Sequence, residues 1–84
     1  MSIDERILQC FREVTGIPAS KVIEWHKPIR NEGVDSLEVI EFLYTLGQSL
    51  QLDSVDTDQL SNNRQLTLDD IRTHFLNYLN SVVA

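Results

Sequence analysis

The residues with the clearest chemical potential are a serine and an aspartate in the segment NEGVDSLEVIEFL, residues 31–43. Ser36 directly precedes apolar residues at helical spacing, and Asp35 stands where that helix begins. An aspartate there can cap the helix by accepting hydrogen bonds from unpaired backbone N–H groups, with Glu38 capping in return. We therefore expect the Ser36 hydroxyl at the surface, at the positive end of the helix dipole, where an attached phosphate is favourably placed.

Use of Ser36 as a catalytic nucleophile would need a general base and a residue that orients the base. The two histidines, His26 and His74, do not lie in motifs that would bring them to Ser36. No spacing of cysteine, histidine and carboxylate residues resembles a metal site, and no glycine-rich loop resembles a nucleotide site. We therefore do not expect the chain to be an enzyme, and we interpret Ser36 as a residue that another protein modifies.

Two of the predicted helices flank a long irregular loop. The first helix follows the capping pair Ser2 and Glu5 and ends at Gly16, which tolerates the left-handed backbone of a helix stop. The loop covers residues 17–34, where proline, asparagine and glycine interrupt any periodicity. The second helix begins at Ser36. Its core side is predicted from apolar residues at helical spacing: Val39, Ile40, Phe42, Leu43, Leu46 and Leu50.

Two further helices complete the predicted fold. Asp56 or Thr57 can begin one short helix that runs through Leu60. Thr67 opens a final helix in a capping pair with Asp70. Apolar residues recur down one side of that helix, at Leu68, Ile71, Phe75, Leu79 and Val82. We therefore predict an all-α fold, a small four-helix bundle with a long first loop, which forms a single domain over residues 1–84.

The acidic residues are concentrated in one third of the chain. The net charge is −6, and residues 31–63 contain seven acidic residues with no lysine or arginine. Such a field repels nucleic acid and anionic lipid and attracts basic protein surfaces. The N-terminal MSIDERILQC does not resemble a secretory signal, and no apolar stretch is long enough to span a membrane. A cytoplasmic protein that is a monomer when free is expected, with its lone cysteine, Cys10, in the core.

The second helix also places large apolar groups on the side that faces away from the core. Leu37 and Tyr44 lie one above the other there, next to Glu41. Exposed apolar residues beside a carboxylate are typical of a surface that binds another protein.

The segment GVDSLEVIEFL resembles the signature around the attachment serine of acyl carrier proteins, in which a glycine, a variable residue and Asp-Ser-Leu open the second helix. The resemblance extends over nearly all of the chain, because the capped first helix, the long loop, the short third helix and a final helix beginning with LTLDDI occur in that family's order. It implies a carrier whose Ser36 receives 4′-phosphopantetheine from coenzyme A, through a phosphopantetheinyl transferase that uses magnesium. The thiol of this arm would then hold an acyl group as a thioester.

The resemblance also implies roles for the neighbours of Ser36. Asp35 is expected to help position the serine and the metal ion of the transferase. Acyl-loading and acyl-using enzymes with basic docking surfaces are expected to grip four residues of the second helix, Leu37, Glu38, Glu41 and Tyr44. The acyl chain is expected between the helices, beside Phe42, Leu46 and Ile71.

Two features depart from the family pattern. Glu32 stands where an apolar residue, commonly leucine, usually precedes the glycine. The second half of the helix, YTLGQSLQL, carries no charge, whereas carriers of primary fatty acid synthesis have glutamates there. Gly47 also weakens this helix by up to about 1 kcal/mol relative to alanine. The thinner acidic surface favours a specialised carrier with its own partners, in a secondary or accessory acyl pathway, over the general fatty acid carrier. The pathways that the resemblance allows are those of fatty acid, polyketide or related secondary acyl synthesis.

Two alternatives remain open. An aminoacyl or peptidyl carrier would use Ser36 in the same way but serve an adenylating enzyme, and such domains usually lack so concentrated an acidic segment. A helical adaptor would keep the carrier fold without modification, so that Ser36 would be only part of a capped helix and replacement by alanine would leave function intact.

Overall fold

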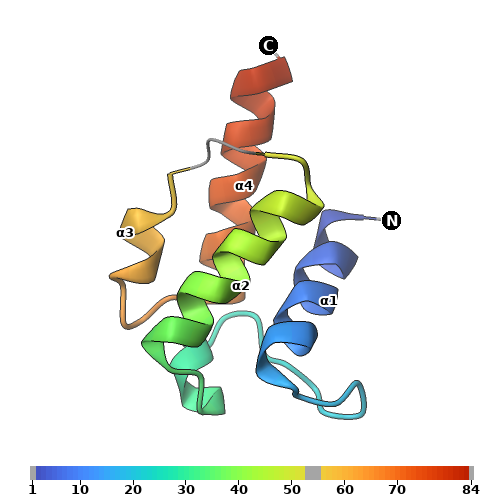
Figure 1. Ribbon diagram of the computed structural model, residues 1–84, viewed down its shortest axis with the longest axis vertical. Helices are drawn as coiled ribbons and strands as arrows, with labels where there is room; N and C mark the ends of the chain where they lie inside the picture. Colours follow the sequence, from blue (N-terminus) through green and yellow to red (C-terminus); the bar gives the residue numbers. More distant parts are fainter. Residues whose placement is uncertain (1, 53–55, 84) are drawn as a thin grey trace.

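The computed structural model describes residues 2–52 and 56–83, with side chains as far as residue 80. Asp53, one of the acidic residues of the 31–63 stretch, therefore lies outside the description. The elements in chain order are α1 (Ile3–Thr15), the 3₁₀ helix η1 (Ile29–Glu32), α2 (Ser36–Ser49), α3 (Asp58–Ser61) and α4 (Leu68–Val83). In Figure 1, α2 crosses in front of α4, with α1 on one side and α3 on the other. The predicted all-α fold with three main helices and one short helix is confirmed.

Local hydrogen bonds fix the helix starts where the sequence predicts them. Ser2 Oγ accepts a hydrogen bond from Glu5 N at 3.2 Å, and α1 stops at Gly16, whose φ is 75°. At the start of α4, Asp70 N donates to Thr67 Oγ1 at 3.0 Å, and Thr67 N donates to Asp70 Oδ2 at 3.1 Å. Each of these bonds satisfies a backbone N–H group that the first turn leaves unpaired.

The core lies where α1, α2 and α4 face one another. Phe11 of α1 and Phe42 of α2 are completely buried and meet edge to face, with ring centroids 5.3 Å apart. This arrangement suits the charge distribution of aromatic rings and fixes how the two helices pack. Cys10 is buried, as predicted. From α4 the core receives the predicted residues Leu68, Ile71 and Phe75, whereas Leu79 is half-buried and the side chain of Val82 lies outside the described residues.

Ile40 is the exception on α2. Helical spacing predicts it at the edge of the core side, but its side chain is 53% exposed. The short α3 covers that side of α2 only in part, so Ile40 borders an open cavity. The prediction for Ile40 is therefore wrong, whereas Val39, Phe42, Leu43 and Leu46 are buried as expected. None of the helices in the described part of the chain is both long enough and apolar enough to cross a membrane.

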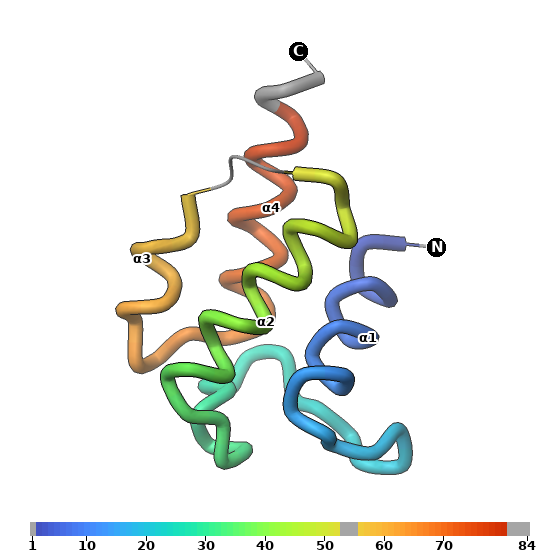
Figure 2. Tube along the Cα trace, viewed as in Figure 1, coloured from blue at the N-terminus to red at the C-terminus, as the bar shows by residue number. Residues whose placement is uncertain are grey.

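Backbone hydrogen bonds fasten the long first loop, traced in Figure 2, to the start of α4. Ile29 N donates to Leu66 O at 2.9 Å, and Asp69 N donates to Trp25 O at 3.1 Å. The Trp25 ring packs against the core and is half-buried. The sequence predicts only irregular backbone between α1 and α2, but the structure places η1 there, directly before α2.

Candidate functional site

Ser36 is the first residue of α2, and its side chain is exposed. The capping box around it is confirmed, because Glu38 N donates to Asp35 Oδ1 at 2.8 Å and Asp35 N donates to Glu38 Oε1 at 3.2 Å. Both bonds use groups that a helix start would otherwise leave unpaired. They place the Ser36 hydroxyl at the surface, at the positive end of the α2 dipole.

Arg30 of η1 lies against Ser36, a contact that the sequence does not predict. Arg30 Nη1 donates a hydrogen bond to Ser36 Oγ at 3.0 Å. The Nε atom of the same guanidinium is buried without a hydrogen-bond partner. The one signal in the sequence is that Arg30 is the last cation before the acidic stretch of residues 31–63. The site therefore combines a serine hydroxyl, a capping carboxylate and a guanidinium.

The backbone of Arg30 is held from both ends of η1. Ile29 is buried, and its N–H is bonded to Leu66 O, two residues before the start of α4. Gly33 ends η1 with φ 82°, a conformation that glycine adopts without strain, and its N–H donates to Arg30 O at 3.1 Å. Val34, which follows, is buried in the core. The turn that connects Arg30 to Ser36 is thus anchored by packing as well as by hydrogen bonds.

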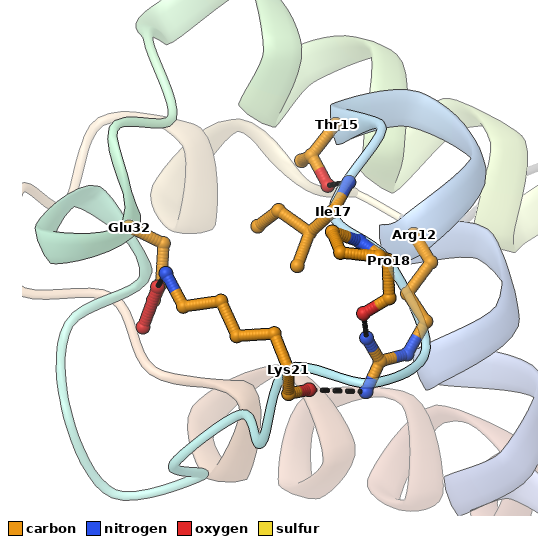
Figure 3. Close-up of polar contacts among 6 residues, drawn as sticks. All are labelled: Arg12, Thr15, Ile17, Pro18, Lys21 and Glu32. Carbon is orange, nitrogen blue, oxygen red and sulfur yellow. Dashed lines mark hydrogen bonds and ion pairs between the residues drawn. The ribbon is translucent and has the colours of Figure 1, made fainter.

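A chain of polar contacts, shown in Figure 3, ties α1 to η1 through the first loop. The Arg12 guanidinium of α1 donates to Pro18 O and, at 2.9 Å, to Lys21 O. The Lys21 ammonium pairs with the Glu32 carboxylate at 2.6 Å. The Glu32 carboxylate is therefore held by an ion pair. Because this pair is partly exposed, its effect on stability is modest, and its main consequence is the position of the loop relative to η1.

Three of the four predicted partner-binding residues, Leu37, Glu41 and Tyr44, lie exposed on one face of α2. The side chains of Leu37 and Tyr44 are 75% and 68% exposed, and Glu41 between them is also exposed. Ile40 extends the apolar part of this face. Glu38 differs from the others, because it is half-buried and its carboxylate accepts the Asp35 N–H bond. We refer to Leu37, Ile40, Glu41 and Tyr44 as the α2 strip.

A cavity of about 180 Å³ lies beside the α2 strip. Its lining comes from α2, from the segment around α3 and from α4: Ile40, Leu43, Tyr44, Gly47, Gln48, Leu52, Thr57 and Phe75. The sequence-based expectation was a space beside Phe42, Leu46 and Ile71, but these three side chains are completely buried in the core and do not line this cavity. The expectation of an acyl chain beside Phe42, Leu46 and Ile71 therefore stays a prediction, and the cavity lies on the α3 side of α2.

In the described part of the chain, neither histidine is placed to act as a general base for Ser36. His26 is exposed in the first loop, and Nε2 of His74 lies 2.8 Å from Asp56 O, so neither ring is hydrogen bonded to the serine. Cys10 is buried in the core, and this burial raises the pKa of its thiol. Because the thiolate is the reactive form, Cys10 is a poor nucleophile. Within the same residues, no group of three histidine, cysteine or carboxylate side chains is arranged to hold a metal ion.

A scan against protein-family models matches residues 5–67 to the PP-binding family, described as the phosphopantetheine attachment site. The match covers more than half of the chain and includes most of α1 and all of η1, α2 and α3. Searches of the curated proteins and of the solved structures found no match. Members of the PP-binding family carry 4′-phosphopantetheine covalently attached to a serine. The chain belongs to this phosphopantetheine attachment-site family, and its role is that of a phosphopantetheine carrier.

Proposed function

We propose that this chain is an acyl carrier, one domain over residues 1–84, in which Ser36 bears the phosphopantetheine arm. The observation that carries the proposal is the exposed Ser36 hydroxyl at the first position of α2, next to a capping aspartate and within the part of the chain that matches the family.

The other serines that the structure describes in the matched region are less suited to modification. Ser49 is half-buried and accepts a hydrogen bond from Arg6 Nη1 at 3.0 Å. The Ser61 hydroxyl donates to the backbone oxygen of Asp58 at 3.0 Å. Ser20 is exposed but lies in the first loop, away from any helix start. Ser36 alone among these has an exposed hydroxyl at the N-terminus of a long helix, which favours an attached phosphate.

The chemistry of attachment fits the groups around Ser36. Ser36 Oγ forms a bond to phosphorus of coenzyme A, adenosine 3′,5′-bisphosphate leaves, and the hydroxyl proton passes to a base of the transferase. Asp35 would help position the serine and the magnesium ion of that enzyme. Once attached, the arm supplies a terminal thiol that holds an acyl group as a thioester. The chain itself contributes presentation of the arm, and the acyl-transfer chemistry belongs to its partners.

We propose that partner enzymes bind the α2 strip together with Glu38. Leu37 and Tyr44 offer exposed apolar area, and Glu41 adds negative charge within the acidic stretch. Apolar groups of this kind supply binding energy, and charge steers the encounter with basic surfaces on the transferase and on the acyl-loading and acyl-using enzymes. A free monomer in the cytoplasm remains the expectation from the sequence.

The nature of the cargo is also part of the proposal. The cavity beside the α2 strip is lined mainly by apolar side chains, including Leu43, Leu52 and Phe75, which supports an acyl cargo over an aminoacyl one. The absence of charge between Phe42 and Leu52 supports a dedicated set of partners in a polyketide or other secondary or accessory pathway. Loading assays with acyl-transferring and with adenylating enzymes would distinguish the two kinds of carrier.

Intact-mass spectrometry tests the attachment. The chain is incubated with coenzyme A, magnesium and a broad-specificity phosphopantetheinyl transferase, in parallel with Ser36→Ala and with Ser20→Ala as a matched control. We expect a mass gain of one arm for the wild type and for Ser20→Ala, and no gain for Ser36→Ala. A folded wild type that gains no mass with several transferases would contradict the proposal and favour the unmodified adaptor.

A further inference from the structure

We propose that Arg30 is a positioning residue that holds the phosphate group of the arm on Ser36. This inference rests on the proposed function, because it needs the arm on that serine. The guanidinium keeps the start of the arm on the η1 side of α2. It thereby restricts rotation about the bonds of the Ser36 side chain.

The geometry of the guanidinium carries the first step. Arg30 Nη1 already touches Ser36 Oγ, at 3.0 Å, the atom to which phosphorus becomes bonded. After modification, the non-bridging phosphate oxygens lie one bond beyond phosphorus, within reach of the same guanidinium. An arginine has five N–H donors, and Ser36 Oγ is the one acceptor that the described residues give to this side chain. Anionic phosphate oxygens accept stronger hydrogen bonds from arginine than a neutral hydroxyl does.

The charges around Ser36 carry the second step. The N-terminus of α2 attracts a phosphate. Asp35 precedes Ser36 in the sequence and Glu38 follows it, and the negative charges of their carboxylates repel a phosphate on the serine. Arg30 compensates for this repulsion. Among the described residues its guanidinium has no carboxylate partner, whereas both lysines of the chain are in ion pairs. Its positive charge is therefore available to the phosphate without the loss of an existing ion pair.

The rigidity of η1 carries the third step. The Ile29 N–H bond to Leu66 O and the Gly33 N–H bond to Arg30 O fix the backbone on both sides of the arginine. Arg30 is half-buried as a residue, and the Nε atom of its guanidinium is enclosed by protein. Part of the conformational entropy that a free arginine loses on binding a phosphate is therefore already lost in the unmodified protein.

Phosphorus NMR tests the inference, because it reports on the phosphate itself. The arm is attached to the wild type, to Arg30→Gln and to Arg64→Gln, and intact mass verifies attachment before each spectrum. Arg64 is a matched control, because it is exposed, makes no hydrogen bond or ion pair among the described residues and gives the same change in net charge. We expect the ³¹P resonance of Arg30→Gln to be shifted from that of the wild type, and that of Arg64→Gln to coincide with it. Arg30→Lys, which lacks the planar fork, should lie between them.

Thermal unfolding provides a second readout. For each variant, Tm is measured with and without the arm, so that any effect of the substitution on the unmodified fold cancels in the difference. We expect Tm with the arm minus Tm without the arm to be lower by about 2–5 °C in Arg30→Gln than in Arg64→Gln.

Equal ³¹P resonances and equal Tm differences in Arg30→Gln and Arg64→Gln, with the arm attached, would overturn the role of Arg30 and leave the proposed function intact. A wild type that accepts no arm would overturn both, and the mass spectrum separates these two results. If Arg30→Gln does not fold, Arg30→Lys and the ¹⁵N resonance of the Arg30 side chain decide the question. An Arg30 resonance that is unchanged by attachment of the arm would refute the inference.

Discussion

Replacing Asp35 by alanine removes the carboxylate oxygen that accepts the Glu38 N–H bond at 2.8 Å. Loss of an N-cap of this kind costs about 1 kcal/mol, because water satisfies the freed N–H group less well. A domain of this size has a total stability on the order of 5–10 kcal/mol, so we expect Asp35→Ala to remain folded with Tm lowered by about 4–8 °C. Thermal unfolding followed by circular dichroism measures this change.

Asp35→Asn separates capping from charge. Asparagine caps a helix about as well as aspartate, so this variant should retain most of the stability that Asp35→Ala loses. It lacks the negative charge that would help position the magnesium ion of the transferase, so the rate of arm attachment should fall in both variants. If Asp35→Asn lowers Tm as much as Asp35→Ala does, the hydrogen bond of the cap is not what stabilises α2. If Asp35→Asn accepts the arm at the wild-type rate, the charge has no role in attachment.

Three further predictions concern the core and the α2 strip. Burial raises the pKa of the Cys10 thiol above its ordinary 9.0, so the thiol of the unfolded chain loses its proton at a lower pH than that of the folded protein. The free energy of unfolding should therefore fall as pH rises above about 9.0. Urea unfolding should show a smaller fall in Cys10→Ala. A wild type and a Cys10→Ala protein with the same pH dependence would contradict this. Phe42→Ala removes the ring that packs against Phe11 and should cost about 3–5 kcal/mol in urea unfolding, and a cost below about 1 kcal/mol would contradict the observed packing. Glu41→Gln should raise the KM of the transferase for this chain at low salt and not at high salt, whereas Glu13→Gln on α1 should leave it unchanged, and equal effects would argue against docking on α2.

The helix starts could be predicted because capping is local. Ser2, Asp35 and Thr67 each bond to a backbone N–H three residues further along, so the few letters around each cap contain all the information. The buried side of α2 follows in the same way from helical spacing, and Val39, Phe42 and Leu46 are where that spacing predicts them.

The rest depends on contacts between elements that are distant in sequence. The burial of Ile40 depends on how much of α2 the short α3 covers. Helical spacing within α2 does not indicate the length of α3. The cavity on the α3 side has the same origin. Arg30 reaches Ser36 because η1 is fastened to the start of α4 by the Ile29 N–H bond to Leu66 O, and no pattern within the first loop indicates this bond.

Fragmentation mass spectrometry that locates the arm tests the central claim most directly. Trypsin releases residues 31–64 as one peptide, since no lysine or arginine lies between Arg30 and Arg64, and fragment ions must then distinguish its four serines. We predict that the protein treated with coenzyme A and a transferase carries one arm, on Ser36. An arm on Ser49 or another serine, or a peptide that remains unmodified, would contradict the account.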